Sequence, residues 1–382
     1  MKIRVYVPAV CIAVVLNITF VMDVFGGAFD NPAVGSKGIG MGNSFTGIAD
    51  DASAVYYNPA GLVFNKKETL YCELYTYRLT LRHEYTEDSI TSNSNEPTFI
   101  PGFFISKRYE DWAFGFGYYV PYAGGGSAYH NFLGRGYDLE SSAGFAAITP
   151  AVAYKLGSKL SVGVGLTMYM GGIERKEAGV KMEYEGVAGY GGHIGFFYKP
   201  TDEWSVGFMA RSPAPIEMDG EIKIAGIKYD SEVEFQFPGS FYLGCGYKPD
   251  PKLTYSLTVS YRLWGQMDEM TFRTDVIGTT KQKTYYKNTW GVAAGMEYWI
   301  TDDLAFWAGF IFLQGGTEAK GLKPEDCDVN MLDPNIGFAY KISESIEVDI
   351  SGVYMHGFKK EYGSKEYSFQ HSLVCLGLRF EF

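Results

Sequence analysis

Leu-Thr-Tyr-Ser-Leu-Thr-Val-Ser-Tyr-Arg-Leu, residues 253–263, is the most informative stretch of the chain. Its odd positions are leucine, valine or tyrosine, and its even positions are threonine, serine or arginine. Because successive side chains of a β-strand point to opposite faces, this alternation predicts a strand with one apolar and one polar face. Its length matches the roughly 9–11 residues that a tilted barrel strand needs to cross a bilayer.

The same alternation recurs along the chain, at 160–170, 346–354 and 374–382. Short polar turns rich in Pro, Gly, Asp and Ser separate pairs of such runs. These turns lie at 108–111, 156–159, 199–203, 248–252, 301–303 and 342–345. Their spacing of about 45 residues is also that of a propeller blade, but each span holds two long strands and not four.

The turns give the number of strands. Six short turns at one membrane face separate seven hairpins, which predicts an all-β fold with 14 antiparallel transmembrane strands. Longer connections are expected at 86–97, 122–143, 175–187, 213–232, 268–284, 314–331 and 359–367. Closure into a barrel follows because only a closed sheet satisfies every backbone hydrogen bond in lipid.

Composition excludes several classes of protein. Of the 382 residues, 16% are aromatic, 20% are charged and 47 are glycine, so the chain is not disordered. Beyond the N-terminus, no stretch of about 18 apolar residues predicts a membrane-spanning helix. The net charge of −11 argues against a nucleic-acid partner, since phosphate binding needs a basic face.

Catalytic and metal-binding patterns are also missing from the sequence. The five cysteines form no Cys-x-x-Cys pair, and the five histidines show no metal-ligand spacing. No nucleophile elbow, zinc-protease motif or phosphate-binding loop occurs. We therefore expect no enzymatic activity, no metal and no cofactor.

The N-terminus predicts export. Lys2 and Arg4 precede an apolar run from Val5 to Val15, and Gly26-Gly27-Ala28 supplies small residues for cleavage. This order is typical of a signal peptide, which we expect at residues 1–28.

Residues 29–66 do not alternate like a strand. Gly, Ala and Ser dominate, so the backbone can pack closely. Asp50 and Asp51 predict the N-cap of a short helix from Ala52 to Tyr57, and Pro59 predicts its end. We expect this segment to be a compact plug inside a barrel formed by residues 67–382.

The segment from Ala49 to Leu62 contains Asn58-Pro59-Ala60 and resembles the hatch motif of the FadL/OmpP1/TodX family. The hatch residues that the resemblance assigns are Asp50, Asp51, Asn58, Pro59 and Ala60. The resemblance implies a 14-stranded barrel of the bacterial outer membrane that is plugged by the hatch and takes up long-chain fatty acids or other hydrophobic compounds. It also implies a monomer among outer-membrane lipid and lipopolysaccharide. Phe382 resembles the C-terminal signal that the barrel assembly machinery reads.

Apolar residues at inward positions are candidates for lining a ligand pocket. They are Met209, Trp299, Trp307, Ile311, Leu313, Val353 and Met355, and Phe45 of the plug segment is a further candidate. A dry, aromatic lining suits a hydrophobic ligand, and packing against the hatch is the alternative.

Three arginines, Arg211, Arg262 and Arg379, also face inward. Each is a candidate partner for a ligand carboxylate, or alternatively for a hatch aspartate.

The connection at 122–143 is rich in glycine and aromatic residues. Tyr129, Phe132 and Leu133 are its candidates for an outer hydrophobic groove, and a flexible surface loop is the alternative.

Together these features predict passive uptake of hydrophobic molecules through a hatch-gated barrel. Release would require either hatch movement or a gap in the barrel wall. Two other functions remain open: a general diffusion porin for small polar solutes, and a structural or adhesive barrel without transport.

Overall fold

The computed structural model describes residues 34–65, 68–85, 89–93, 98–129, 138–276, 278–322, 328–363 and 365–382. The expected signal peptide, residues 1–28, lies outside the described residues. Among the helices of the described part, none combines the length and the apolar content that crossing a membrane requires.

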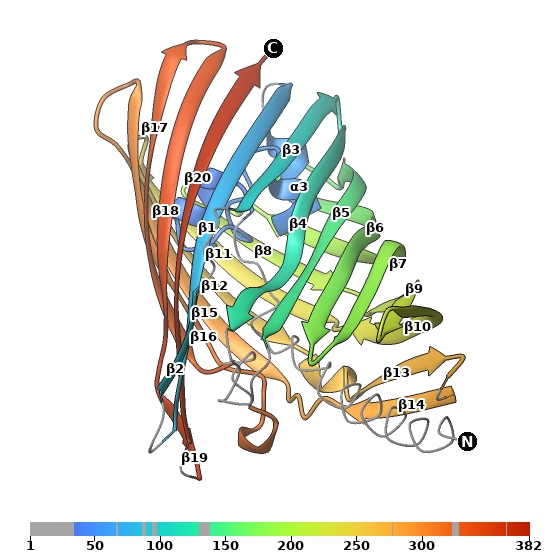
Figure 1. Ribbon diagram of the computed structural model, residues 1–382. Coiled ribbons are helices and arrows are strands. Elements are labelled where there is room, and N and C mark those ends of the chain that lie inside the picture. The colour runs from blue at the N-terminus through green and yellow to red at the C-terminus, as the bar shows by residue number, and fades with distance from the viewer. Residues whose placement is uncertain are drawn as a thin grey trace, which may run out of the picture.

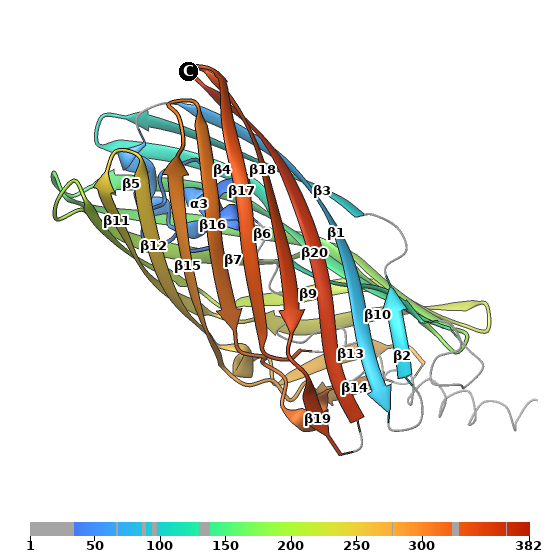
Figure 2. The same cartoon turned by 90° about the vertical axis from the view of Figure 1, so that its left-hand side faces the viewer.

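One antiparallel sheet closes on itself to form the barrel (Figure 1). The strands are β1 Thr69–Tyr85, β2 Ser89–Asn93, β3 Thr98–Tyr109, β4 Trp112–Tyr129, β5 Leu139–Lys155, β6 Leu160–Glu177, β7 Val180–Tyr198, β8 Trp204–Arg211, β9 Ala214–Ile224, β10 Ile227–Phe237, β11 Ser240–Asp250, β12 Leu253–Arg262, β13 Glu269–Thr274, β14 Gly278–Lys283, β15 Thr289–Trp299, β16 Leu304–Leu313, β17 Met331–Ser343, β18 Ile346–Gly357, β19 Lys360–Tyr362 and β20 Lys365–Glu381. Closure comes from β1 and β20, which pair along their whole lengths and lie side by side in Figure 2.

These elements make up the 14 strands of the barrel, which confirms the predicted fold. Six barrel strands are each built from two consecutive elements: β2 with β3, β8 with β9, β10 with β11, β12 with β13, β14 with β15, and β18 with β19. Pro213 and Pro238 lie at two of the interruptions, where a residue without an N–H cannot continue the hydrogen-bond ladder.

The outer surface carries an apolar belt. In β12, Leu257 and Val259 are exposed, whereas Thr258 and Ser260 on the other face are buried in the barrel. Aromatic pairs mark the edge of the belt near the short turns, with Trp112 packed on Tyr154 at a centroid distance of 4.6 Å and Trp204 on Tyr247 at 4.4 Å. This distribution places apolar side chains against lipid and aromatic side chains at the interface.

Five of the expected long connections are largely strand, which corrects the prediction; β4 and β5 extend into 122–143, and β19 and β20 occupy most of 359–367. The connection at 175–187 is a two-residue turn between β6 and β7, and 213–232 and 268–284 fall mostly in the hairpins β9–β10 and β13–β14. Their inner face is still apolar, with Met218 and Phe272 buried, but the outer face carries charges such as Glu217. Polar outer residues are typical of loops, but a strand that extends beyond the lipid has the same pattern.

The hatch consists of α2 Ser36–Gly40, α3 Ala54–Tyr57 and the 3₁₀ helix η3 Pro59–Phe64; two more 3₁₀ helices, η5 Trp264–Gln266 and η6 Ala319–Gly321, lie between strands. It sits inside the barrel, near the end that carries the C-terminus (Figure 1). The helix begins at Ala54 and not at Ala52, because Ser53 is its N-cap and Asp51 Oδ1 accepts the Ser53 N–H at 2.8 Å. Asp51 therefore closes the turn before the helix.

Candidate functional site

Asn58, Pro59 and Ala60 anchor the hatch to the wall. The Asn58 side chain donates through Nδ2 to the carbonyl of Phe196 on β7 at 3.1 Å and to that of Thr46 at 3.2 Å. Its Oδ1 accepts the Ala60 N–H at 3.2 Å. One buried amide thus joins the wall and two parts of the hatch.

Glycines make room for this contact. A side chain at Gly195 on β7 would collide with Asn58 Oδ1, and one at Gly163 on β6 would collide with the backbone of Ala60. On the neighbouring β8, Gly207 faces the carbonyl of Thr46 in the same way. Because a Cβ does not fit, the hatch backbone lies directly on a flat floor of glycines.

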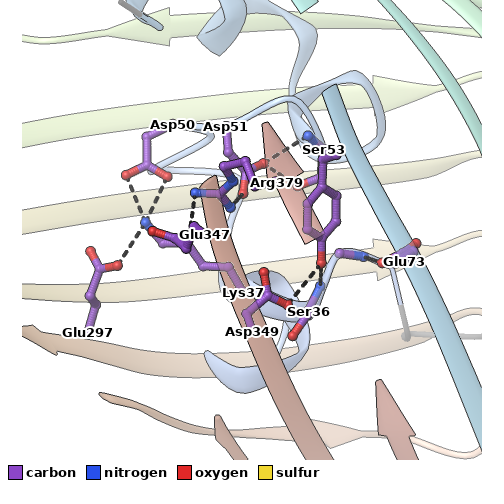
Figure 3. A network of polar contacts seen from close by, with 12 residues as sticks. Ser36, Lys37, Asp50, Asp51, Ser53, Glu73, Glu297, Glu347, Asp349 and Arg379 are labelled. Carbon is purple, nitrogen blue, oxygen red and sulfur yellow. Dashed lines mark hydrogen bonds and ion pairs between the residues drawn. The ribbon is translucent and has the colours of Figure 1, made fainter. Parts of the chain in front are cut away.

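Charged side chains hold the opposite side of the hatch (Figure 3). Lys37 of α2 lies 3.0 Å from the carboxylates of both Asp50 and Glu297, which belongs to β15. Trp307 of β16 donates through Nε1 to Glu297 at 3.0 Å. The buried lysine therefore connects two hatch turns to two wall strands.

The charges of Lys37 and Asp50 shift each other's pKa. Burial alone would lower the pKa of Lys37, but the carboxylates of Asp50, Glu297 and Asp51 outweigh it and hold this pKa above its usual range. Burial acts to raise the pKa of Asp50, but the charge and hydrogen bonds of Lys37 lower it below its ordinary value. The pair stays ionised at neutral pH.

Arg379 of β20 forms the second ion-pair cluster in Figure 3. Its guanidinium lies 3.1 Å from Asp51 of the hatch and 3.0 Å from Glu347 of β18. The contact with Asp51 corresponds to the hatch aspartate, one of the two candidate partners of Arg379. The arginine balances two buried carboxylates at once.

Further hydrogen bonds complete this side. The N–H of Gly35 donates to Glu73 on β1 at 2.8 Å, and the N–H of Ser36 donates to the Tyr71 hydroxyl at 2.9 Å. The Ser351 hydroxyl on β18 donates to the Ser36 carbonyl at 2.7 Å. The start of the hatch is thereby tied to β1 and β18.

A pocket lies between the hatch and the wall. Its lining comprises Asn43, Thr46, Tyr56, Tyr57, Met209, Arg211, Tyr242, Thr258, Ser260, Arg262, Ala293 and Ile311. Four of the residues singled out from the sequence meet here: Met209, Ile311, Arg211 and Arg262. Thr258 and Ser260 share a face with Arg262, so alternation alone identifies them, whereas no sequence pattern pointed to Tyr56 or Tyr242.

Arg211 contacts the hatch within this pocket. Its Nη2 donates to the carbonyl of Tyr56 at 3.0 Å, and its guanidinium lies 4.6 Å from the Tyr56 ring centroid. Next to it, a ring nitrogen of His193 contacts the Val55 carbonyl at 2.9 Å. Within the described part of the chain, no carboxylate pairs with Arg211, although the residue is buried. Arg262, by contrast, donates to Ser260 Oγ at 3.1 Å.

The other predicted lining residues lie elsewhere. Phe45 and Trp307 are buried in a cluster with hatch residue Met41, and Leu313, Val353 and Met355 are buried in a second cluster. Trp299 is half-buried near the short turns, where Lys341 lies 4.0 Å from its ring. Phe132 and Leu133 lie outside the described residues, as does the side chain of Tyr129, so the outer groove stays a prediction.

The wall is not paired throughout. Strands β3 and β4 pair from Phe103–Tyr118 to Tyr109–Trp112. Beyond Tyr118, β4 pairs only with β5 among the described residues, and it bulges between Tyr119 and Tyr122. In the described part of the chain, the stretch of β3 that precedes Phe103 pairs with β1 alone. Tyr119 packs edge-on against Tyr56 of the pocket at 5.1 Å. The unpaired part of the wall therefore begins next to a residue that touches the pocket lining.

A group of three carboxylates lies on the outer extension. Glu217, Glu232 and Glu234 bring oxygens within 4.8 Å of one another. Arg273 lies 3.2 Å from Glu232 and also pairs with Glu234. The group is accounted for as an exposed ion-pair cluster.

Comparison with known proteins gives one family. The sequence model of the family described as "Outer membrane protein transport protein (OMPP1/FadL/TodX)" matches residues 21–379. A search of curated proteins finds no match. Among solved structures, a FadL homologue of Pseudomonas aeruginosa has a TM-score of 0.79 at 14% identity, covering 93% of this chain and 99% of its own.

Two further structures are similar in the same way. The Pseudomonas putida toluene transporter TodX has a TM-score of 0.76 at 17% identity, with 93% of this chain and 99% of its own covered. The Ralstonia pickettii toluene transporter TbuX has a TM-score of 0.69 at 18% identity, with 91% and 99% covered. At these identities, the structures show a shared fold.

Proposed function

The chain belongs to the outer membrane protein transport protein family (OMPP1/FadL/TodX), and from this premise we propose that it is a passive channel for hydrophobic molecules whose lumen is plugged by the hatch. The protein is a β-barrel of the bacterial outer membrane. The observation that carries the proposal is the pocket between hatch and wall, with Met209 and Ile311 on its apolar side. Apolar burial contributes about 25 cal/mol per Å², so such a solute binds with few polar contacts.

The solute class follows from the charge of Arg211. A buried guanidinium without a carboxylate partner favours an anionic group, and a carboxylate matches its fork geometry. We therefore favour an amphipathic carboxylate, such as a long-chain fatty acid, over a neutral hydrocarbon. The toluene transporters TodX and TbuX share the fold, so aromatic hydrocarbons are the second candidate class.

The proposed exit is the unpaired stretch of wall between β3 and β4. A solute in the pocket would pass Tyr119 and leave sideways into lipid. This route leaves the hatch docked, in keeping with its many contacts to the wall. Hatch movement is the alternative route.

We further propose that the barrel works as a monomer surrounded by outer-membrane lipid and lipopolysaccharide. Phe382 is exposed at the end of β20, where the barrel assembly machinery would reach it.

Uptake and conductance together test the channel proposal. Deleting the gene is expected to reduce uptake of labelled long-chain fatty acid or toluene by intact cells, and the purified barrel should show little ohmic conductance in planar bilayers. High conductance would favour the porin function. Unchanged uptake after deletion would favour a structural or adhesive role.

Substitution of Arg211 by methionine tests the head-group assignment. Charge-assisted hydrogen bonds contribute about 1.5–3 kcal/mol, so fatty-acid affinity should fall about 10- to 100-fold. Toluene affinity, measured by calorimetry on the same preparation, should change little and so controls for pocket damage. R211K keeps the charge, so its fatty-acid affinity should lie between those of the wild type and R211M. Equal losses for both ligands would contradict the assignment.

A further inference from the structure

Two polar residues on either side of a proline interrupt the apolar inner face of β17. Asp333, Pro334 and Asn335 lie in the strand, with Asp333 and Asn335 on the inner face. Asp333 is 0% exposed and Asn335 is 6% exposed. Asp-Pro normally begins a turn, so this triplet is out of place in the middle of a barrel strand.

The two inner side chains have unmet hydrogen-bonding capacity. Within the described part of the chain, neither carboxyl oxygen of Asp333 has a hydrogen-bond partner, and neither does Oδ1 of Asn335. The Asn335 Nδ2 donates to the Asp333 carbonyl at 2.6 Å. This bond orients the amide, and Oδ1 is its atom without a partner among the described residues. Buried polar groups normally have partners, so a carboxyl and an amide oxygen side by side point to a missing one.

Their surroundings are apolar and adjoin the proposed pocket. Asp333 pairs across the sheet with Ile311, and Ile311 pairs with Ala293. Both Ile311 and Ala293 line the pocket, so Asp333 stands on the next strand of the same wall. Met331 and Met355, from the buried cluster on β17 and β18, are flexible neighbours that a ligand can displace.

We propose that Asp333 and Asn335 form a subsite for the hydroxyl group of an otherwise apolar solute. A hydroxyl donates to Asn335 Oδ1 or to an ionised Asp333, and it accepts from a protonated Asp333, so it satisfies the pair in either protonation state. The barrel would then prefer phenols or alcohols over hydrocarbons of the same shape. The inference rests on the proposed function, because it assumes a solute in the pocket.

Binding of toluene and p-cresol, which differ by one hydroxyl, tests the subsite on the full-length barrel in detergent. Wild-type protein is expected to bind p-cresol about tenfold more tightly, the effect of one hydrogen bond to a buried polar site. D333L should abolish this preference, leave toluene binding in place and raise the unfolding temperature, since a buried carboxyl without a partner is removed. N335L, which removes the second residue of the subsite, should also abolish the preference for p-cresol.

Asp328 offers a matched control, since it is another buried aspartate but accepts bonds from the N–H and hydroxyl of Thr317. D328N should lower stability and keep the p-cresol preference. A wild-type protein without that preference, or one that D333L and N335L leave intact, would overturn the subsite and leave water as the missing partner. Wild-type protein that binds a long-chain fatty acid but neither aromatic compound would overturn the subsite and leave the proposed function in place, whereas protein that binds none of the three would contradict the proposed function itself.

Discussion

Replacement of Gly195 by leucine should convert the plugged barrel into an open pore. The new side chain would occupy the place of Asn58 Oδ1 and push the hatch away from β7. The Asn58 amide is held by hydrogen bonds to Phe196, Thr46 and Ala60, so turning it away from the new side chain would break these bonds. Since the hatch fills the lumen beside the pocket, its displacement should raise single-channel conductance by at least about tenfold.

Gly144 of β5 provides the control for this change. A side chain there meets nothing within 4 Å, so G144L alters the wall without touching the hatch. It should conduct like the wild type. G195A adds only the Cβ and should give an intermediate result if G195L does not assemble. A G195L barrel that stays closed, or a G144L barrel that opens equally, would contradict the docking described for Asn58.

Substitution of Arg379 by leucine should have the largest effect on stability. It leaves the carboxylates of Asp51 and Glu347 buried with no cation between them. Removing one partner of a buried ion pair costs about 3–5 kcal/mol, more than deleting the pair as a whole. We expect a loss of this size in the free energy of unfolding, measured with denaturant in detergent.

Two further variants test whether the loss of stability comes from the uncompensated charges. R379K keeps the charge but lacks the fork that reaches both acids, and should recover part of the loss. The triple variant R379L/D51N/E347Q removes the uncompensated charges and should recover most of it. If R379L unfolds like the wild type, the cluster does not hold the hatch.

The barrel was predictable because its signal is spread over the chain. Alternation in residues 253–263, together with six polar turns, fixed the strand number and the inner face that carries Met209 and Ile311. The outer hairpins were not predictable as strands, because the charged outer residues of β9, such as Glu217, look like those of a loop.

The site was only partly predictable for a different reason. Alternation places Arg211, Arg262 and Arg379 inside, but their partners come from the hatch and depend on the three-dimensional fold. Arg379 meets Asp51, whereas Arg211 meets the carbonyl of Tyr56. The unmet polar groups of Asp333 and Asn335 depend in the same way on which strands lie beside β17.

The most direct test of the central claim is an experimental structure of the barrel solved with a bound long-chain fatty acid. We predict elongated density between the hatch and the wall, with its carboxylate on Arg211 and its chain along Met209 and Ile311. A water-filled pocket with a docked hatch and no ligand density would contradict the claim that this pocket binds the transported molecule.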